Sequence, residues 1–229
     1  MNATLYSGTS TLEIMTNAKR YNAFLEKLII KYIPNSGKIL DIGAGIGTFA
    51  QKINTRGYDV YCVEPDNKQS KYIEKTGLPV SLSIEEVEDN SVDYIYSLNV
   101  LEHIENDTES LKIWTKKLKP CGKILLYVPA FNILYSSFDK SVEHYRRYRK
   151  KTLACCFTNA GLQIEKAKYA DSIGFFVSLI YKWINNTGEI NNKSLVFYDN
   201  VLFPISRFCD FFCSGLFGKN VYIVGKRSK

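Results

Sequence analysis

Three glycines at alternate positions, Gly43, Gly45 and Gly47, are the first pattern that could do chemistry. They follow the β-prone segment 38–42, so they occupy a strand-to-helix turn whose bare backbone can approach a ligand closely. Asp41 comes just before this turn and suits a cationic group better than a pyrophosphate. Part of the turn also has the GxGxxA form used for binding dinucleotides. A tight turn with a purely structural role is a further alternative.

Glu64 is the second candidate for ligand binding, because it closes the next predicted strand, over 58–63. A carboxylate at that strand end can accept hydrogen bonds from the two hydroxyls of a ribose. Nicotinamide and adenosyl cofactors both contain such a ribose, so Glu64 by itself does not distinguish them.

A third group of reactive side chains lies in the aromatic and basic connector 129–149. A histidine can accept a proton near neutral pH, which makes His144 a candidate base, and an arginine can clamp a carboxylate or phosphate. A structural histidine beside a solvated basic helix start is the alternative. The candidates for catalysis are His144, Tyr145 and Asp139, and those for substrate binding are Tyr135, Arg146 and Arg147.

Glu102 and His103 open a predicted helix, so we expect them to organise their loop. The two histidines and six cysteines of the chain lack the spacing of a zinc-ligand set, and no metal is expected. The cysteines contain no CxxC pair, so they are expected to be reduced thiols.

The hydrophobic pattern predicts the elements that position these residues. Apolar steps of three and four indicate helices, and apolar runs bounded by glycine or proline indicate strands. The predicted helices cover 17–33, 48–56, 66–75, 111–118, 150–160 and 204–217, and the predicted strands cover 38–42, 58–63, 79–83, 92–98, 123–128, 162–169 and 220–224. This alternation implies a mainly parallel sheet with helices on both faces and a ligand site beyond the carboxyl ends of the strands.

The composition is that of one domain with a substantial core: 229 residues, of which 45% are hydrophobic and 23% charged. Disordered and fibrous classes are excluded because compositional bias is absent. The net charge of +7 permits anionic partners without choosing among phosphorylated metabolites, nucleic acid and acidic lipid. The longest apolar stretch, 172–181, is too short to span a bilayer, and segment 1–10 lacks the features of a secretion signal, so a cytoplasmic protein is expected.

Five segments, in order and spacing, resemble the class I S-adenosylmethionine-dependent methyltransferases between residues 17 and 130. They are Ile-Leu-Asp-Ile-Gly-Ala-Gly-Ile-Gly at 39–47, Val-Glu-Pro-Asp at 63–66, Ser-Val-Asp-Tyr-Ile at 91–95, Asn-Val-Leu-Glu-His-Ile at 99–104 and Leu-Lys-Pro-Cys-Gly at 118–122. The segment Asp-x4-His-Tyr-Arg-Arg-Tyr at 139–148 resembles a bacterial branch of that family. The resemblance implies an α/β fold, a Rossmann-like sheet of seven strands in the order 3-2-1-4-5-7-6.

The resemblance also implies S-adenosylmethionine as the cofactor and assigns residues to it. These are Tyr21, Asp41, Gly43, Gly45, Gly47, Glu64, Pro65, Ser83, Ile84 and Asn99. The glycine turn would hold the methionine part, Glu64 the ribose hydroxyls, and the 83–84 region the adenine edge. Asn99 would lie near the sulfonium. Tyr21 would close over the methionine end, with plain core packing as its alternative.

The implied reaction is methyl transfer to oxygen or nitrogen of a small-molecule, sugar or glycan-linked acceptor. Alignment and desolvation supply most of the help in such a displacement, so a base need only remove the acceptor's proton. Two alternatives stay open: a nicotinamide-dependent oxidoreductase and a non-catalytic methyltransferase-like binding subunit. No nucleic acid partner is expected, because the Asn/Asp-Pro-Pro-aromatic signature of base methylation is missing at Asn99.

We expect a single methyltransferase domain with an insertion before the last strand. Its parts are a helical N-terminal cap (1–36), a cofactor-binding core (37–169), an insertion or lid (170–219), and a last strand with a basic tail (220–229). The predicted helix 204–217 in the insertion is amphipathic and has an aromatic face. That face could pack on its own domain, form a homodimer, or make peripheral contact with the inner face of a membrane.

Overall fold

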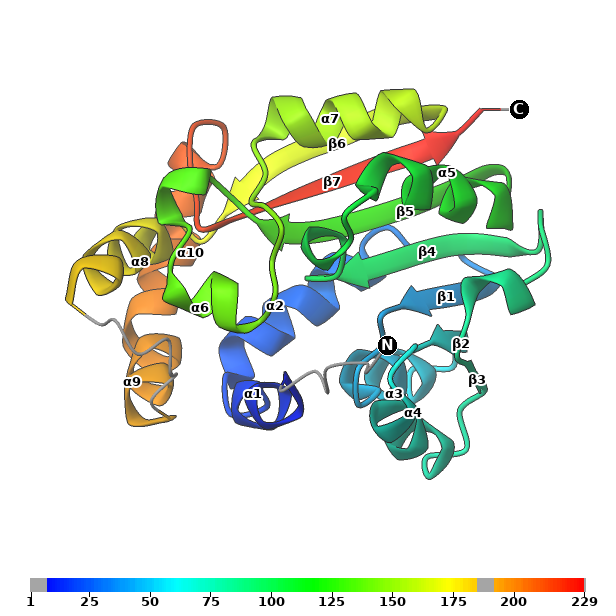
Figure 1. Cartoon of the computed structure of the whole chain (residues 1–229), viewed down its shortest axis with the longest axis horizontal. Helices are drawn as coiled ribbons and strands as arrows, with labels where there is room; N and C mark the ends of the chain where they lie inside the picture. Colours follow the sequence, from blue (N-terminus) through cyan, green and yellow to red (C-terminus); the bar gives the residue numbers. More distant parts are fainter. Residues whose placement is uncertain (1–7, 185–191, 229) are drawn as a thin grey trace.

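A seven-stranded sheet forms the centre of the computed structural model, which describes residues 8–184 and 192–228 (Figure 1). The strand order is β3-β2-β1-β4-β5-β7-β6, and helices pack around the sheet. The predicted α/β fold and its strand order are therefore confirmed. Parts of the predicted cap, insertion and tail, namely 1–7, 185–191 and 229, lie outside the described residues.

The strands β1 to β5 are parallel, and β7 runs antiparallel between β5 and β6. Their bounds are β1 (Lys38–Ile42), β2 (Asp59–Val63), β3 (Val80–Ser81), β4 (Val92–Leu98), β5 (Leu118–Pro129), β6 (Leu162–Ala170) and β7 (Asn220–Arg227). The strand β5 begins before the predicted segment 123–128, because it already pairs with β4 at Leu118.

Helices cover the two faces of the sheet and its edge. Their bounds are α1 (Gly8–Met15), α2 (Lys19–Ile30), α3 (Thr48–Asn54), α4 (Asn67–Glu74), α5 (Asp107–Lys117), α6 (Ser137–Ser141), α7 (Lys150–Asn159), α8 (Ser172–Ile184), α9 (Asn192–Phe197) and α10 (Phe203–Cys213). Short turns of helix are η1 (Ile84–Glu86), η2 (Leu101–His103), η3 (Asn132–Leu134) and the π-helix η4 (Tyr198–Leu202).

Two hydrophobic cores hold the helices on the sheet. On one face, Leu25 and Ile29 of α2 pack with Ile53 of α3 against β1 and β2. On the other face, Trp114 of α5 and Phe157 of α7 pack against β4, β5 and β7. Both faces are therefore sealed, and the carboxyl ends of the parallel strands remain as the place for a ligand.

The elements α8, α9, η4 and α10 lie between β6 and β7 in the chain, and Figure 1 shows them beyond the ends of the strands. In α10 the polar residues Ser206 and Asp210 are buried, whereas Phe208, Phe211 and Phe212 are 72%, 82% and 69% exposed. Asp210 accepts hydrogen bonds from the backbone N–H groups of 171 and 172, which draws the polar face inward. The aromatic face of the predicted helix thus points away from its own domain.

Among the described residues, no helix combines the length and the apolar character that a membrane crossing requires.

Candidate functional site

The glycine turn follows β1 and carries the backbone conformation that the sequence pattern predicts. Gly43, Gly45 and Gly47 all have positive φ, at 72°, 57° and 79°, which residues with a Cβ rarely adopt. A Cβ at Gly43 would lie 2.3 Å from the side chain of Val100. The turn therefore requires glycine both for its conformation and for its close contact with the segment after β4.

Glu64 directly follows β2 beside this turn, and its buried carboxylate is held on two sides. The backbone N–H of Gly45 donates to Oε2 across 2.7 Å, and the N–H of Asp66 donates to Oε1 across 3.0 Å. Burial raises the pKa of Glu64, while these two hydrogen bonds act in the opposite direction. The carboxylate is thus a fixed hydrogen-bond acceptor next to a side-chain-free backbone.

Asp41 is buried on β1, where the strand register places it beside Tyr96 of β4. The Tyr96 hydroxyl donates to Oδ2 of Asp41 across 2.8 Å. The pKa of Asp41 is raised to about 7, chiefly by burial and also by the negative charge of Glu64, while the hydrogen bond from Tyr96 acts in the opposite direction. A cationic group bound at this edge would stabilise the ionised carboxylate.

Two N-terminal helices lie against the same edge. A Cβ at Gly45 would come within 3.1 Å of Leu12, so α1 covers the glycine turn. On α2, the Tyr21 hydroxyl donates to the Tyr127 hydroxyl across 3.3 Å, and the Tyr21 N–H donates to Asp199 across 2.8 Å. The backbone N–H of Asn99 donates to the carbonyl of Tyr127 across 2.7 Å, so Tyr127 joins the start of α2 to the segment after β4.

The remaining predicted cofactor residues lie near β2 and β3. Pro65 stands between Glu64 and Asp66, and the Asp66 side chain caps α4. Ser83 caps η1, whose first residue is Ile84, shortly after β3 ends. Because β2 lies next to β1 and β3 next to β2 in the sheet, these positions follow the glycine turn toward the β3 edge. Their contact with the adenine end of the cofactor stays a prediction.

The residues at this edge fit S-adenosylmethionine. A turn without side chains admits the methionine part, Glu64 offers oxygens to ribose hydroxyls, and Asp41 is a buried acid that a cationic ligand would stabilise. When bound, this cofactor supplies the methyl group on a sulfonium. The roles of individual residues toward it stay predictions.

The connector after β5 carries a buried ion pair. Nδ1 of His144 lies 2.9 Å from Oδ1 of Asp139, and the Arg147 guanidinium binds both oxygens of Asp139 at 2.8 and 3.0 Å. Burial alone would raise the pKa of Asp139, but the bonds from His144 and Arg147 hold it well below its usual range. The carboxylate therefore stays ionised and fixes the orientation of the His144 ring.

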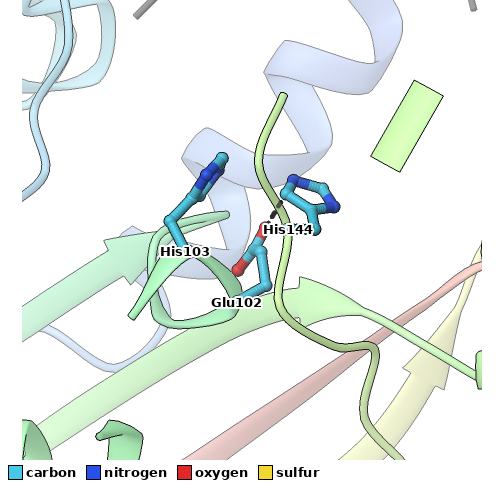
Figure 2. A group of neighbouring side chains, drawn as sticks. All are labelled: Glu102, His103 and His144. Carbon is cyan, nitrogen blue, oxygen red and sulfur yellow. Dashed lines mark ion pairs between the residues drawn. The ribbon is translucent and has the colours of Figure 1, made fainter. Parts of the chain in front are cut away.

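Glu102 and His103 of η2 complete this cluster (Figure 2). Oε1 of Glu102 lies 3.8 Å from Nε2 of His144, and the rings of His103 and His144 are 4.5 Å apart between centroids. Burial raises the pKa of Glu102 to about 8 and lowers that of His103 to about 4. The sequence assigned both residues to loop organisation, since only the folded connector brings them to His144.

The other connector candidates lie around this cluster. The Tyr135 hydroxyl donates to the backbone carbonyl of His144 across 2.6 Å. Arg146 pairs with Asp107 at 2.9 Å, and Tyr145 is exposed and stacks with Arg146. Arg147 is engaged with Asp139. Acceptor binding by Tyr135, Arg146 and Arg147, and catalysis by Tyr145, stay predictions.

Comparison with known proteins agrees with this geometry. Residues 15–167 match the methyltransferase domain family. A ubiquinone biosynthesis O-methyltransferase of Xanthomonas axonopodis pv. citri is 23% identical over an alignment of 197 residues, which covers 76% of this chain and 79% of that protein. An uncharacterized methyltransferase of Bacillus cereus is 30% identical over an alignment of 131 residues, which covers 54% of this chain and 59% of that protein.

A solved structure shares the fold. A SAM-dependent methyltransferase from Archaeoglobus fulgidus superposes with a TM-score of 0.64 at 17% identity, covering 95% of this chain and 99% of that chain. The family match decides against the nicotinamide-dependent oxidoreductase and the non-catalytic subunit that the sequence left open. The chain therefore belongs to the methyltransferase domain family, and it is an enzyme that uses S-adenosylmethionine.

Proposed function

We propose that the enzyme methylates an oxygen atom of a small-molecule or glycan-linked acceptor. The observation that carries this proposal is the Asp139–His144 pair, 2.9 Å apart in the connector after β5. Tyr145 of this connector donates its N–H to the carbonyl of Glu102 across 2.8 Å, so the pair lies beside the segment after β4. Asn99, which we predict to lie near the sulfonium of the methyl donor, belongs to that same segment.

The reaction breaks the bond between sulfur and the methyl carbon and forms a bond from that carbon to the acceptor oxygen. The hydroxyl proton of the acceptor must leave, and the products are the methyl ether and S-adenosylhomocysteine. The Asp139–His144 pair supports removal of this proton, because Asp139 stabilises a positive charge on the imidazole. Nitrogen acceptors need the same alignment, but similarity to ubiquinone biosynthesis O-methyltransferases favours oxygen.

The test is direct. Purified enzyme is incubated with methyl-labelled S-adenosylmethionine and matched panels of hydroxyl and amine acceptors, including sugars and lipid-linked sugars. Formation of S-adenosylhomocysteine is followed, and products are identified by mass spectrometry. Label found only on nitrogen or carbon would contradict the proposal.

We also propose that the α10 surface, formed by Ile205, Phe208, Phe211, Phe212 and Leu216, contacts an anionic membrane surface. An exposed apolar face of this kind marks an interaction site on a protein surface. The net charge of +7 favours an anionic partner, and Lys150 bonds to the backbone of Gly215 beside this surface. A membrane contact there would bring a lipid-linked acceptor close to the insertion that borders the strand ends.

A further inference from the structure

The cluster formed by Glu102, His103 and His144 has the composition of a metal site. One ligand atom from each residue lies within 4.8 Å of the other two, and Figure 2 shows the three side chains together. Two come from η2 and the third comes from the neighbouring connector, so the fold itself assembles the set. This cluster could not be predicted from the sequence, because the two histidines belong to separate segments.

Glu102 carries the first argument. Its side chain is 0% exposed, and within residues 8–184 and 192–228 neither carboxylate oxygen has a hydrogen-bond partner. A buried carboxylate without donors is costly, and such groups in native proteins are satisfied by a partner or an ion. The absence of a hydrogen-bond partner for the Glu102 carboxylate among the described residues therefore indicates that a cation binds here.

The orientation of both imidazoles supports the same conclusion. Nδ1 of His144 is bound to Asp139, which makes Nε2, on the side of Glu102, the acceptor nitrogen of the neutral ring. His103 presents one ring nitrogen to the same cluster. Histidines that bind metals show this arrangement, with one nitrogen held by a carboxylate or carbonyl and the other on the ion.

Ligand chemistry selects the kind of ion. Two imidazoles and one carboxylate form a set that zinc enzymes use, with a fourth position open to water or substrate. Imidazole suits Zn²⁺ and its neighbours, whereas Mg²⁺ prefers oxygen ligands. Bond lengths near 2.1 Å place ligand atoms about 3.4 Å apart around a tetrahedral ion. The observed 3.8 Å between Glu102 and His144 is within a small side-chain rotation of that value.

We propose that Glu102, His103 and His144 bind one divalent transition-metal ion of the zinc type, with Asp139 as the positioning residue behind His144. The inference deepens the proposed function, since an ion here would leave a coordination position for the acceptor oxygen. With Nε2 of His144 on the ion, the bound ion would acidify the acceptor hydroxyl so that its proton leaves to solvent, and Asp139 would keep its positioning role. Binding is measured without turnover, so the metal site and the acceptor assignment can fail separately.

The experiment uses the full chain stripped with a chelator and titrated with Zn²⁺ in a calorimeter and with Co²⁺ in a spectrophotometer. We expect one ion per chain and the visible absorption bands of four-coordinate Co²⁺. Glu102→Gln and His103→Asn should each weaken binding at least about 100-fold, and Asp139→Asn should weaken it by about 10- to 100-fold. Glu105→Gln, an exposed change in the same loop, is the matched control.

Circular dichroism confirms that each variant is folded before its affinity is interpreted. Absence of stoichiometric binding by the parent chain, or equal binding by Glu102→Gln and the parent, would overturn the metal site. If methyl transfer persists in chelator and still depends on His144, the ion is excluded and the proton-accepting role stands. If the ion binds as expected and no hydroxyl acceptor is methylated, the acceptor assignment fails while the site remains.

Discussion

The backbone N–H of Gly45 donates a hydrogen bond to Oε2 of Glu64 across 2.7 Å, which joins the glycine turn to the end of β2. The contact fixes the carboxylate at the place where the ribose of the cofactor is expected. It also means that Glu64 has two tasks, since it holds the turn and offers its remaining acceptor capacity to a ligand. Changes at Glu64 should therefore disturb both the glycine turn and cofactor binding.

Glu64→Ala should weaken binding of S-adenosylmethionine by at least about tenfold. Hydrogen bonds to a charged group contribute about 1.5–3 kcal/mol each, and about 1.4 kcal/mol corresponds to tenfold in affinity. Calorimetric titration of the variant measures the change. Glu86→Ala, an exposed acid after β3, should bind as the parent does. Equal affinity of parent and Glu64→Ala would remove Glu64 from the site.

The pH dependence of stability should report the buried acid Asp41, whose pKa is raised from 3.8 to about 7. Between these values the folded state binds more protons than the unfolded state, so its stability decreases as pH rises and is lowest above pH 7. Glu64 acts in the same direction, since its pKa is also raised.

Asp41→Asn should flatten this profile, because an amide does not ionise and its oxygen can still accept from Tyr96. Each pKa unit corresponds to about 1.4 kcal/mol. Denaturant midpoints at pH 5 and pH 8 should therefore differ less in the variant than in the parent. The exposed Asp59→Asn serves as control and should keep the parental slope. A parental slope in Asp41→Asn would refute the assignment.

His144→Ala should lower turnover by about 10² to 10⁴-fold, the usual contribution of a group that handles a proton in the transition state. Affinity for S-adenosylmethionine should change little, because the partners of the His144 ring described above, Asp139, Glu102 and His103, are not among the residues that we predict to bind the cofactor. Rapid-quench and calorimetric measurements separate the two effects. The Tyr135 bond to the backbone carbonyl of His144 remains in the variant, which limits loss of connector structure. A turnover loss below about threefold would assign His144 to a structural role.

Local patterns predicted the elements well where burial is continuous. Strands β1 and β4 have the predicted bounds, because buried parallel strands read as apolar runs that end at glycine or polar residues. The glycine turn and Glu64 could be placed for the same reason, since each directly follows a strand. By contrast, α1 carries no predicted pattern, and its cover over Gly45 appears only in the folded chain.

The meeting of Glu102 with His144 could not be predicted, because it depends on how the long connector packs on η2. That packing is fixed by contacts far apart in the chain, such as the Tyr145 N–H donating to the carbonyl of Glu102 across 2.8 Å. Similarly, helical periodicity showed which residues of α10 share a face. It did not show which face turns inward, because that depends on Asp210 capping the start of α8.

The last prediction concerns the α10 surface. Burying one exposed phenylalanine side chain contributes about 1.5–3 kcal/mol, so three of them dominate any contact that this surface makes. Replacing Phe208, Phe211 and Phe212 by Ser should reduce flotation with anionic vesicles by at least tenfold while leaving methyl transfer to a water-soluble acceptor intact. Folding should not suffer, because the buried side of α10 consists of other residues, including Ser206 and Asp210. Tyr72→Ser, an exposed change on α4 away from α10 in Figure 1, is the control. Light scattering tests the alternative that this surface binds a second copy of the chain. A parent chain that never floats, but forms a dimer that the triple change converts to monomers, would assign the surface to dimerisation.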